Sequence, residues 1–167
     1  MKIISNFVDG KLTQESPSNY ISLFKPTTGE EYAHVPITPK DEFQKIIKKM
    51  KLAQSSWSET PITRRSNILF KFKSLIEKNF DELAKIISEE HGKVFSDAKG
   101  SLQRGLEVVD FACGIPHLLK GEYSENVGTN IDSWSIRQPL GVCAGITPFN
   151  FPAMVPMWMY PIAIASG

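Results

Sequence analysis

Residues that could carry out chemistry are sparse in this chain of 167 residues. The thiols and imidazoles belong to Cys113, Cys143, His34, His91 and His117. The cysteines form no C-x-x-C pair and no metal-ligand spacing, and the histidines are scattered. Cys113 falls on the apolar stripe of an expected helix and Cys143 in an expected buried strand, where thiols are usually inert. We therefore predict no metal site and no nucleophile among the cysteines, and we assign the histidines no role.

Asn150 is a polar side chain in an otherwise apolar region, in the sequence "TPFNFP". It follows the run "GVCAGI", whose small apolar residues predict a strand buried on both faces, as in a parallel sheet. The carboxyl end of such a strand is where open α/β sheets bind ligands. The alternative is that Asn150 only closes the turn by bonding to its own backbone, as turn asparagines often do. The residue pattern alone leaves both readings open.

Arg104 is a second candidate, in the sequence "LQRGLEVV". A guanidinium can bind a carboxylate through two parallel hydrogen bonds, and Gly105 beside it could let a ligand or backbone approach. The alternative is a surface arginine paired with Glu107 one turn further on. The basic pairs Lys48–Lys49 and Arg64–Arg65 are interpreted as solvated helix faces.

The elements expected to position these residues begin with two β-hairpins. Asp9–Gly10 is a strong hairpin turn, and Pro26–Glu30 joins Tyr20–Phe24 to Tyr32–Val35. Four helices follow, indicated by apolar residues at helical spacing, and the fourth carries Leu102, Leu106, Val109 and Cys113 on one face. The predicted helix starts are an N-cap at Thr38, the pair Thr60–Pro61, a capping box of Asn79 with Glu82, and an N-cap at Ser96.

After Gly121 the pattern changes to strands and a buried helix. Alternating residues in "EYSENV" and "DSWSIRQ" predict an antiparallel β-ribbon, followed by the strand "GVCAGI" and the wholly apolar helix Ala153–Ala165. A helix that is apolar all round must be buried in a larger protein. A parallel sheet needs repeated strand–helix units, and only one is present. The sequence therefore predicts an α/β fold that is cut off after the first strand–helix unit of a doubly wound domain.

Composition excludes two classes of partner. The net charge is +1, which gives no electrostatic reason to expect nucleic acid binding. Residues 142–167 carry no charge, but four prolines (148, 152, 156 and 161) interrupt them, so we expect no membrane span. Two cysteines and no recognisable signal peptide predict a cytoplasmic location.

The run "GVCAGITPFNFPAMVPMWMYPIAIASG" resembles the first strand, loop and helix of the aldehyde dehydrogenase cofactor domain, whose usual turn is P-W-N-F-P. Upstream segments such as "NFVDGK" and "KPTTGEEYAHVP" agree in order and spacing, so the resemblance covers nearly the whole chain. No G-x-G-x-x-G follows the strand, and this family binds its dinucleotide without one. The segment "HGKVFSDAKGSLQRGLEVVDFAC", with Phe149 in place of tryptophan, looks most like the coenzyme A-acylating methylmalonate-semialdehyde dehydrogenases.

The resemblance implies an incomplete, N-terminal part of the aldehyde dehydrogenase fold. Residues 1–120 would be the N-terminal part of the cofactor-binding domain, and residues 121–139 a β-ribbon through which subunits form a homo-oligomer. Residues 140–167 would be the truncated first strand and helix of the Rossmann-like cofactor domain.

The resemblance also implies roles for individual residues. Asn150 would donate its amide to the aldehyde oxygen while a cysteine attacks the carbon, an interaction worth roughly 3–4 kcal/mol of barrier. Thr147 and Phe149 match positions whose backbone is close to the cofactor, and Arg104 would reach the carboxylate of the substrate. In the family, the nucleophilic cysteine, the general-base glutamate and the residues that bind the ribose follow after the position of Gly167.

The implied activity is the NAD-dependent oxidation of methylmalonate or malonate semialdehyde to an acyl-CoA, with coenzyme A as co-substrate and this chain inactive by itself. One alternative is a hydrolytic NAD(P)-dependent aldehyde dehydrogenase that releases a free acid. Another is a non-catalytic remnant that serves only as an interaction module.

Overall fold

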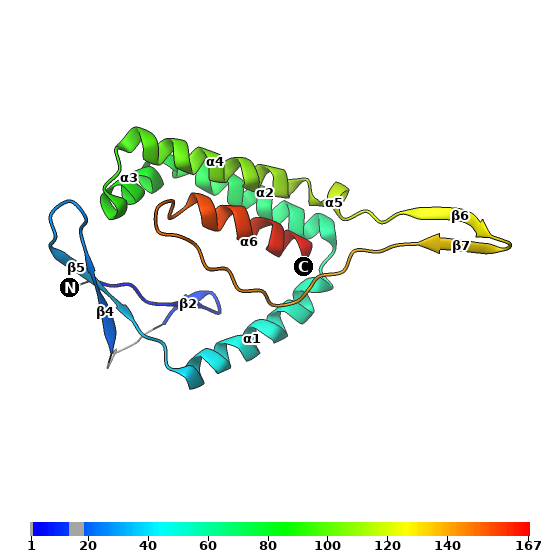
Figure 1. Ribbon diagram of the computed structural model, residues 1–167, viewed down its shortest axis with the longest axis horizontal. Helices are drawn as coiled ribbons and strands as arrows, with labels where there is room; N and C mark the ends of the chain where they lie inside the picture. The colour runs from blue at the N-terminus through cyan, green and yellow to red at the C-terminus, as the bar shows by residue number, and fades with distance from the viewer. Residues whose placement is uncertain (1, 14–18) are drawn as a thin grey trace.

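The computed structural model describes residues 2–13 and 19–167 and combines small β-sheets with a layer of packed helices (Figure 1). The strands are β1 (Lys2–Ile3), β2 (Phe7–Val8), β3 (Lys11–Leu12), β4 (Tyr20–Phe24), β5 (Glu31–Pro36), β6 (Tyr123–Gly128) and β7 (Ile131–Trp134). The helices are α1 (Lys40–Ser58), α2 (Ile62–Lys78), α3 (Phe80–His91), α4 (Phe95–Cys113), α5 (Ile115–Leu118) and α6 (Met154–Ser166).

Both predicted hairpins are confirmed. Strands β2 and β3 pair antiparallel around Asp9 and Gly10, whose φ angles of 55° and 74° are the positive values that such a turn requires. Strands β4 and β5 also pair antiparallel, and β1 joins β5 in parallel to complete a three-stranded sheet. The parallel strand β1 was not expected from the sequence.

The ribbon predicted after Gly121 is present as the antiparallel pair β6–β7. It extends away from the helices (Figure 1), and every residue of β7 is exposed. Its edges are therefore free to pair with another chain.

The four predicted helices form, but their caps differ from the prediction. Thr38 accepts a hydrogen bond from Asn6 at 2.7 Å and leaves Pro39 at the N-cap of α1. The Asn79 amide donates to the Leu75 carbonyl at the end of α2 (2.7 Å), so it makes no capping box for α3. Ser96 lies inside the first turn of α4, which begins at Phe95. Short polar side chains bond to whichever unsatisfied backbone group lies nearest, and only the folded chain decides which one that is.

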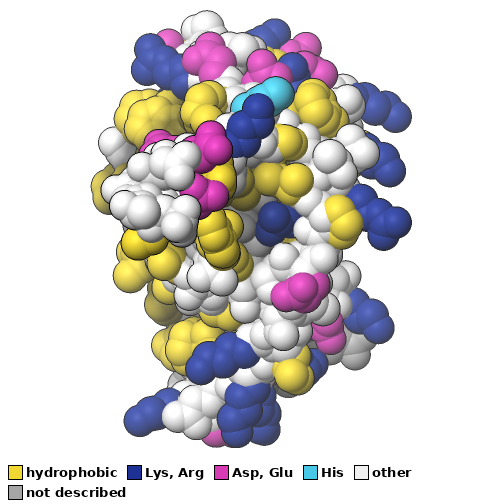
Figure 2. Space-filling view, turned by 90° about the vertical axis from the view of Figure 1, so that its right-hand side faces the viewer, with side chains coloured by type: hydrophobic (Ala, Val, Ile, Leu, Met, Phe, Trp, Pro, Cys, Tyr) yellow, Lys and Arg dark blue, Asp and Glu magenta, His cyan; other side chains and the backbone are white. Residues whose placement is uncertain are grey.

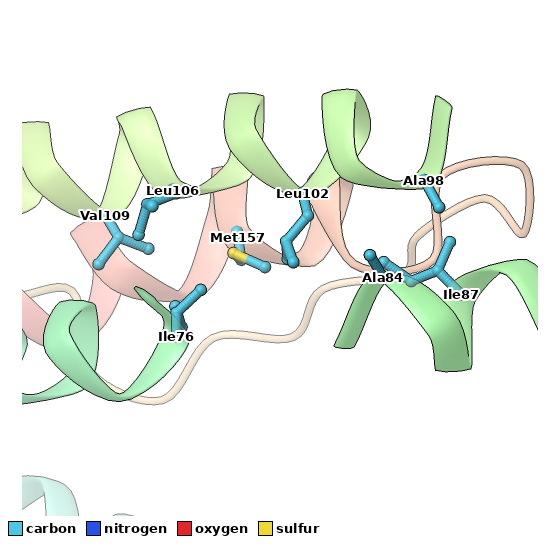
Figure 3. Packing of buried hydrophobic residues seen from close by; sticks show 8 residues of the cluster. All are labelled: Ile76, Ala84, Ile87, Ala98, Leu102, Leu106, Val109 and Met157. Atoms are coloured by element: carbon cyan, nitrogen blue, oxygen red, sulfur yellow. The ribbon is translucent and has the colours of Figure 1, made fainter. Parts of the chain in front are cut away.

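The main core lies where α4 packs against α2, α3 and α6. Figure 3 shows Leu102, Leu106 and Val109 pointing from α4 toward Met157 of α6 and Ile76 of α2. The predicted α4 stripe is confirmed, because all four of its residues are buried. A second cluster, which includes Leu69, Cys113 and Ala165, continues the core along the same helices.

Gly105 allows α4 and α6 to approach closely. A Cβ at this position would lie 2.9 Å from the Met157 sulfur and 3.3 Å from the Met154 Cα. Of the two approaches that the sequence left open at Gly105, a ligand or backbone, the structure shows the backbone of α6.

Replacing Gly105 with valine is expected to destabilise the chain by about 2–3 kcal/mol, because the added methyl groups force two packed helices apart. Gly100→Ala on the same helix is the matched control, since a Cβ there meets nothing within 4 Å. The control should gain up to about 1 kcal/mol of helix propensity. Urea unfolding at matched protein concentrations measures both, and equal midpoints for the two variants would contradict the close-approach explanation.

The predicted strand "GVCAGI" is wrong. The chain from β7 to α6 is irregular and runs back between α1 and the helix layer (Figure 1). Leu140 and Ile146 are 96% and 93% exposed, and Cys143 is exposed as well. A buried strand needs neighbouring strands on both edges, and none lies beside this segment in the described part of the chain.

The sequence predicts that the last helix is buried in a larger protein, and in this chain α6 is buried on one face only. Met154, Met157, Pro161 and Ala165 of α6 are buried, but the side chains on its other face are partly exposed. A groove of about 1090 Å³ lies between this face, α1 and residues 137–143, and α1 has no buried residue. Figure 2 views the end from which the ribbon projects and shows hydrophobic side chains spread over it.

We expect the isolated chain to self-associate and to bind a hydrophobic dye. Burying one large apolar side chain stabilises a contact by about 1.5–3 kcal/mol, and many such side chains are exposed here. Light scattering and dye fluorescence measure the two effects, and Leu140→Lys with Ile146→Lys should reduce both. A monodisperse monomer that melts cooperatively and binds no dye would contradict this expectation.

Arg65 corrects the interpretation of the Arg64–Arg65 pair as a solvated face. Its side chain is buried, at 7% exposure, and its Nε and Nη1 atoms have no hydrogen-bond partner within the described residues. Burial of a guanidinium is unfavourable without such partners. Lys48 and Lys49 are exposed as expected, and Lys49 lies 3.6 Å from Asp9. Among the helices described, none is long and apolar enough to cross a membrane.

Candidate functional site

The turn at residues 147–153 places its polar and aromatic groups at the start of α6. Thr147 and Asn150 are exposed, and Phe149 is 88% exposed. The first bonds of the helix begin here, since the Val155 N–H donates to the Phe151 carbonyl and the Met157 N–H to the Ala153 carbonyl. The turn is thus fixed at its α6 end and open to solvent on its outer side.

The Asn150 side chain makes no hydrogen bond to any described residue. No bond therefore supports the alternative that Asn150 closes the turn with its own side chain. Its amide N–H groups are free to donate to an oxygen atom that comes from outside the chain.

Lys93 contacts the same turn, and the sequence did not point to it. Its Nζ donates to the Asn150 carbonyl at 3.1 Å and lies 4.4 Å from the centroid of the Phe151 ring. A lysine between two helices, 57 positions upstream, carries no pattern that connects it to Asn150. Only the fold brings the two together.

Arg104 is exposed on α4, and within the described residues it forms no ion pair with Glu107. The surface pair proposed as its alternative role is therefore absent from the structure. Helices α4 and α6 pack together, but no hydrogen bond in the described part of the chain joins Arg104 to Asn150. Arg104 therefore lies on α4 and Asn150 in the turn that precedes α6, and the structure does not join them directly.

The two cysteines lie in different environments. Cys113 is buried, and burial raises the pKa of its thiol, with a smaller contribution from the negative charge of Asp110. A raised pKa leaves less thiolate at neutral pH, which agrees with an inert cysteine. Cys143 corrects the prediction of a buried residue, because it is exposed, and its Sγ donates to the Gly141 carbonyl at 3.6 Å.

His34 is held within the β4–β5 sheet. Its Nε2 lies 2.8 Å from Glu31 and its ring stacks on Tyr20 at 3.8 Å between centroids. Hydrogen bonds, first from Ser22 and then from His34, lower the pKa of Glu31. No group of three or more metal-ligating side chains occurs among the residues that the structure describes.

Comparison with known proteins identifies the class. The profile of the aldehyde dehydrogenase family matches residues 12–167, and the chain therefore belongs to this family. The mixed α/β fold expected from the sequence is confirmed by the structural match described next, and the boundaries proposed at residues 120 and 139 remain a prediction.

Within the family, the relatives act on semialdehydes according to their names. The chain is 48% identical over 167 residues to the malonate-semialdehyde dehydrogenase of Pseudomonas aeruginosa, covering 100% of this chain and 33% of the relative. It is 46% identical over 164 residues to the mitochondrial acylating methylmalonate-semialdehyde dehydrogenase of Arabidopsis thaliana. That match covers 98% of this chain and 27% of the relative. A Sinorhizobium meliloti 1021 structure assigned as a methylmalonate-semialdehyde dehydrogenase, in complex with NAD, superposes with a TM-score of 0.95 at 45% identity. That match covers 100% of this chain and 34% of the other. The chain thus spans between 27% and 34% of each relative's length.

Proposed function

We propose that this chain provides the oxyanion-binding turn and a carboxylate-binding arginine of an NAD-dependent malonate or methylmalonate semialdehyde dehydrogenase. The observation that carries the proposal is the exposed Asn150 amide, which bonds to no described residue, in a chain 48% identical throughout to a malonate-semialdehyde dehydrogenase.

In the proposed reaction, negative charge develops on the aldehyde oxygen as a cysteine thiolate from elsewhere in the complete enzyme attacks the carbonyl carbon. The Asn150 N–H donates a hydrogen bond to that oxygen. A donor that is already in place needs no reorganisation as the charge forms, which is why such groups lower barriers strongly. A neutral amide also stabilises the oxygen without adding a charge to the site.

Thr147 and Phe149 are proposed to lie beside the cofactor, which accepts a hydride when bound. The support is that both residues are exposed in the structure, Phe149 to 88%. The Sinorhizobium structure, which contains NAD, supports NAD as the cofactor.

Coenzyme A is the proposed acyl acceptor, supported by the word "acylating" in the name of the Arabidopsis relative. The Pseudomonas relative's name specifies no acceptor, so a hydrolytic enzyme that releases a free acid is the second candidate. Mass spectrometry of the product formed with and without coenzyme A distinguishes the two candidates.

We further propose that the complete protein is a cytoplasmic homo-oligomer in which the β6–β7 ribbon pairs subunits. The support is its exposed, unpaired strand edges and its projection from the helices (Figure 1).

The experiment that tests the semialdehyde specificity is Arg104→Ala. It requires a chimera in which this chain replaces the matching segment of the Pseudomonas aeruginosa malonate-semialdehyde dehydrogenase, hereafter the chimera. KM for malonate semialdehyde should rise roughly 10- to 100-fold, since a hydrogen bond to a charged group is worth about 1.5–3 kcal/mol. KM for propanal, which has no carboxylate, should change little.

Arg104→Lys is the matched control. Lysine keeps the charge but lacks the planar fork, so its KM should lie between those of the wild type and the alanine variant. Equal effects of Arg104→Ala on both substrates would exclude carboxylate binding by this residue.

A further inference from the structure

One ammonium group holds two consecutive residues of the Asn150 turn. The Lys93 Nζ donates to the Asn150 carbonyl at 3.1 Å and lies over the Phe151 ring at 4.4 Å. In the part of the chain that the structure describes, no other side chain hydrogen-bonds to residues 147–153. The attachment of the turn to the α3–α4 connection therefore depends on this lysine.

The backbone that carries Lys93 is itself fixed. Ser88 donates its hydroxyl to the Lys93 carbonyl at 2.6 Å, and the Gly92 N–H donates to the Ser88 carbonyl at 2.8 Å. Gly92 has a φ of 84° and ends α3, and a Cβ there would lie 3.3 Å from Pro26 and Thr27. Lys93 thus extends from a junction that is packed against the β4–β5 turn.

We propose that Lys93 is a positioning residue that keeps the Asn150 turn, and with it the Asn150 side-chain amide, aimed at the substrate oxygen. This inference rests on the proposed oxyanion role of Asn150. An oxyanion donor is effective only if it is fixed before the charge develops, and small displacements of such groups slow reactions strongly. Asn150 cannot fix itself, because its side chain bonds to no described residue.

The tether is tested first in the chain itself, by hydrogen–deuterium exchange and mass spectrometry. In Lys93→Met, the amides of Val155 and Met157 should exchange about tenfold faster, because the turn that begins α6 opens more often. Lys99→Met is the matched control: Lys99 pairs with Asp81 at 2.7 Å and lies over Phe80 and Phe95, but it does not contact the turn. Lys93→Arg should restore slow exchange, since a guanidinium also donates to a carbonyl and stacks on a ring.

The outcomes of this first test are distinct. Exchange that is equal in Lys93→Met and Lys99→Met would overturn the proposal. So would faster exchange that extends equally to Leu102 and Val109 in the α4 core, since Lys93 would then support the fold in general.

The consequence for the reaction is tested in the chimera with a double-mutant cycle. Lys93→Met should lower kcat about tenfold, with KM for NAD changing less than about twofold, and Lys93→Arg should recover most of the loss. Added to Asn150→Ala, the same change should lower kcat by less than about twofold, because Lys93 acts through Asn150.

A full additional tenfold loss in the double variant would overturn the inference, since Lys93 would then act elsewhere. If Lys93→Met leaves kcat unchanged while Asn150→Ala lowers it, the role of Lys93 is overturned and the proposed function stands. Full activity of Asn150→Ala would refute the proposed function and, with it, any catalytic consequence of the tether.

Discussion

Replacing Asn150 with alanine in the chimera is expected to lower kcat for malonate semialdehyde by about 10²–10³. The physical reason is the loss of a hydrogen bond that is much stronger in the transition state than with the neutral aldehyde. Affinity for NAD should change little, because the proposed cofactor contacts lie at Thr147 and Phe149. Steady-state kinetics with saturating malonate semialdehyde and a separate NAD titration measure the two quantities.

Asn67→Ala provides the control for this prediction. Asn67 is exposed on α2, outside the 147–153 turn, so its replacement should leave both quantities unchanged. If Asn150→Ala abolishes NAD binding and spares the chemical step, Asn150 supports the turn and does not act on the substrate.

The 167-residue chain by itself is expected to show no dehydrogenase turnover. Cys113 is buried and its thiol pKa is raised, so it provides little thiolate. Cys143 is exposed, but the structure gives it only a carbonyl acceptor and no base in the described residues. Incubation with NAD, coenzyme A and malonate semialdehyde, followed at the absorbance of NADH, measures the activity, and the unmodified chimera is the positive control.

The variant Cys143→Ala tests whether the one exposed cysteine could act as the nucleophile. Turnover that depends on the chain and disappears in Cys143→Ala would show that the chain contains its own nucleophile, and would refute the prediction. Absence of turnover in the chimera as well would favour the alternative named in the sequence analysis, in which the chain is a non-catalytic interaction module.

The local structure of this chain was predictable where short-range chemistry decides it. The Asp9–Gly10 turn formed because both residues adopt positive φ readily. The α4 stripe was predictable because helical spacing places Leu102, Leu106 and Val109 on one face. The family and the Asn150 turn were also recognisable, since both depend on an ordered series of motifs along the chain.

Long-range contacts decided the remaining features. The "GVCAGI" segment has the composition of a buried strand, but strand structure requires hydrogen bonds to neighbours, and the described residues provide none. Asn79 could cap either of two helices, and the geometry of the junction selected the end of α2. Arg65 reads as a surface residue by type, yet the packing of α2 buries it.

At the candidate site, too, local sequence determined some features and long-range contacts determined others. The sequence alone determined which side chain could donate to an oxyanion, because an asparagine in a proline-flanked turn follows from residue type and order. Only the tertiary structure decided that Asn150 is exposed, that Arg104 has no ion pair with Glu107, and that Lys93 bonds to the turn. These features depend on distances between segments far apart in the chain, and such distances are set by helix packing around α4, which no local pattern encodes.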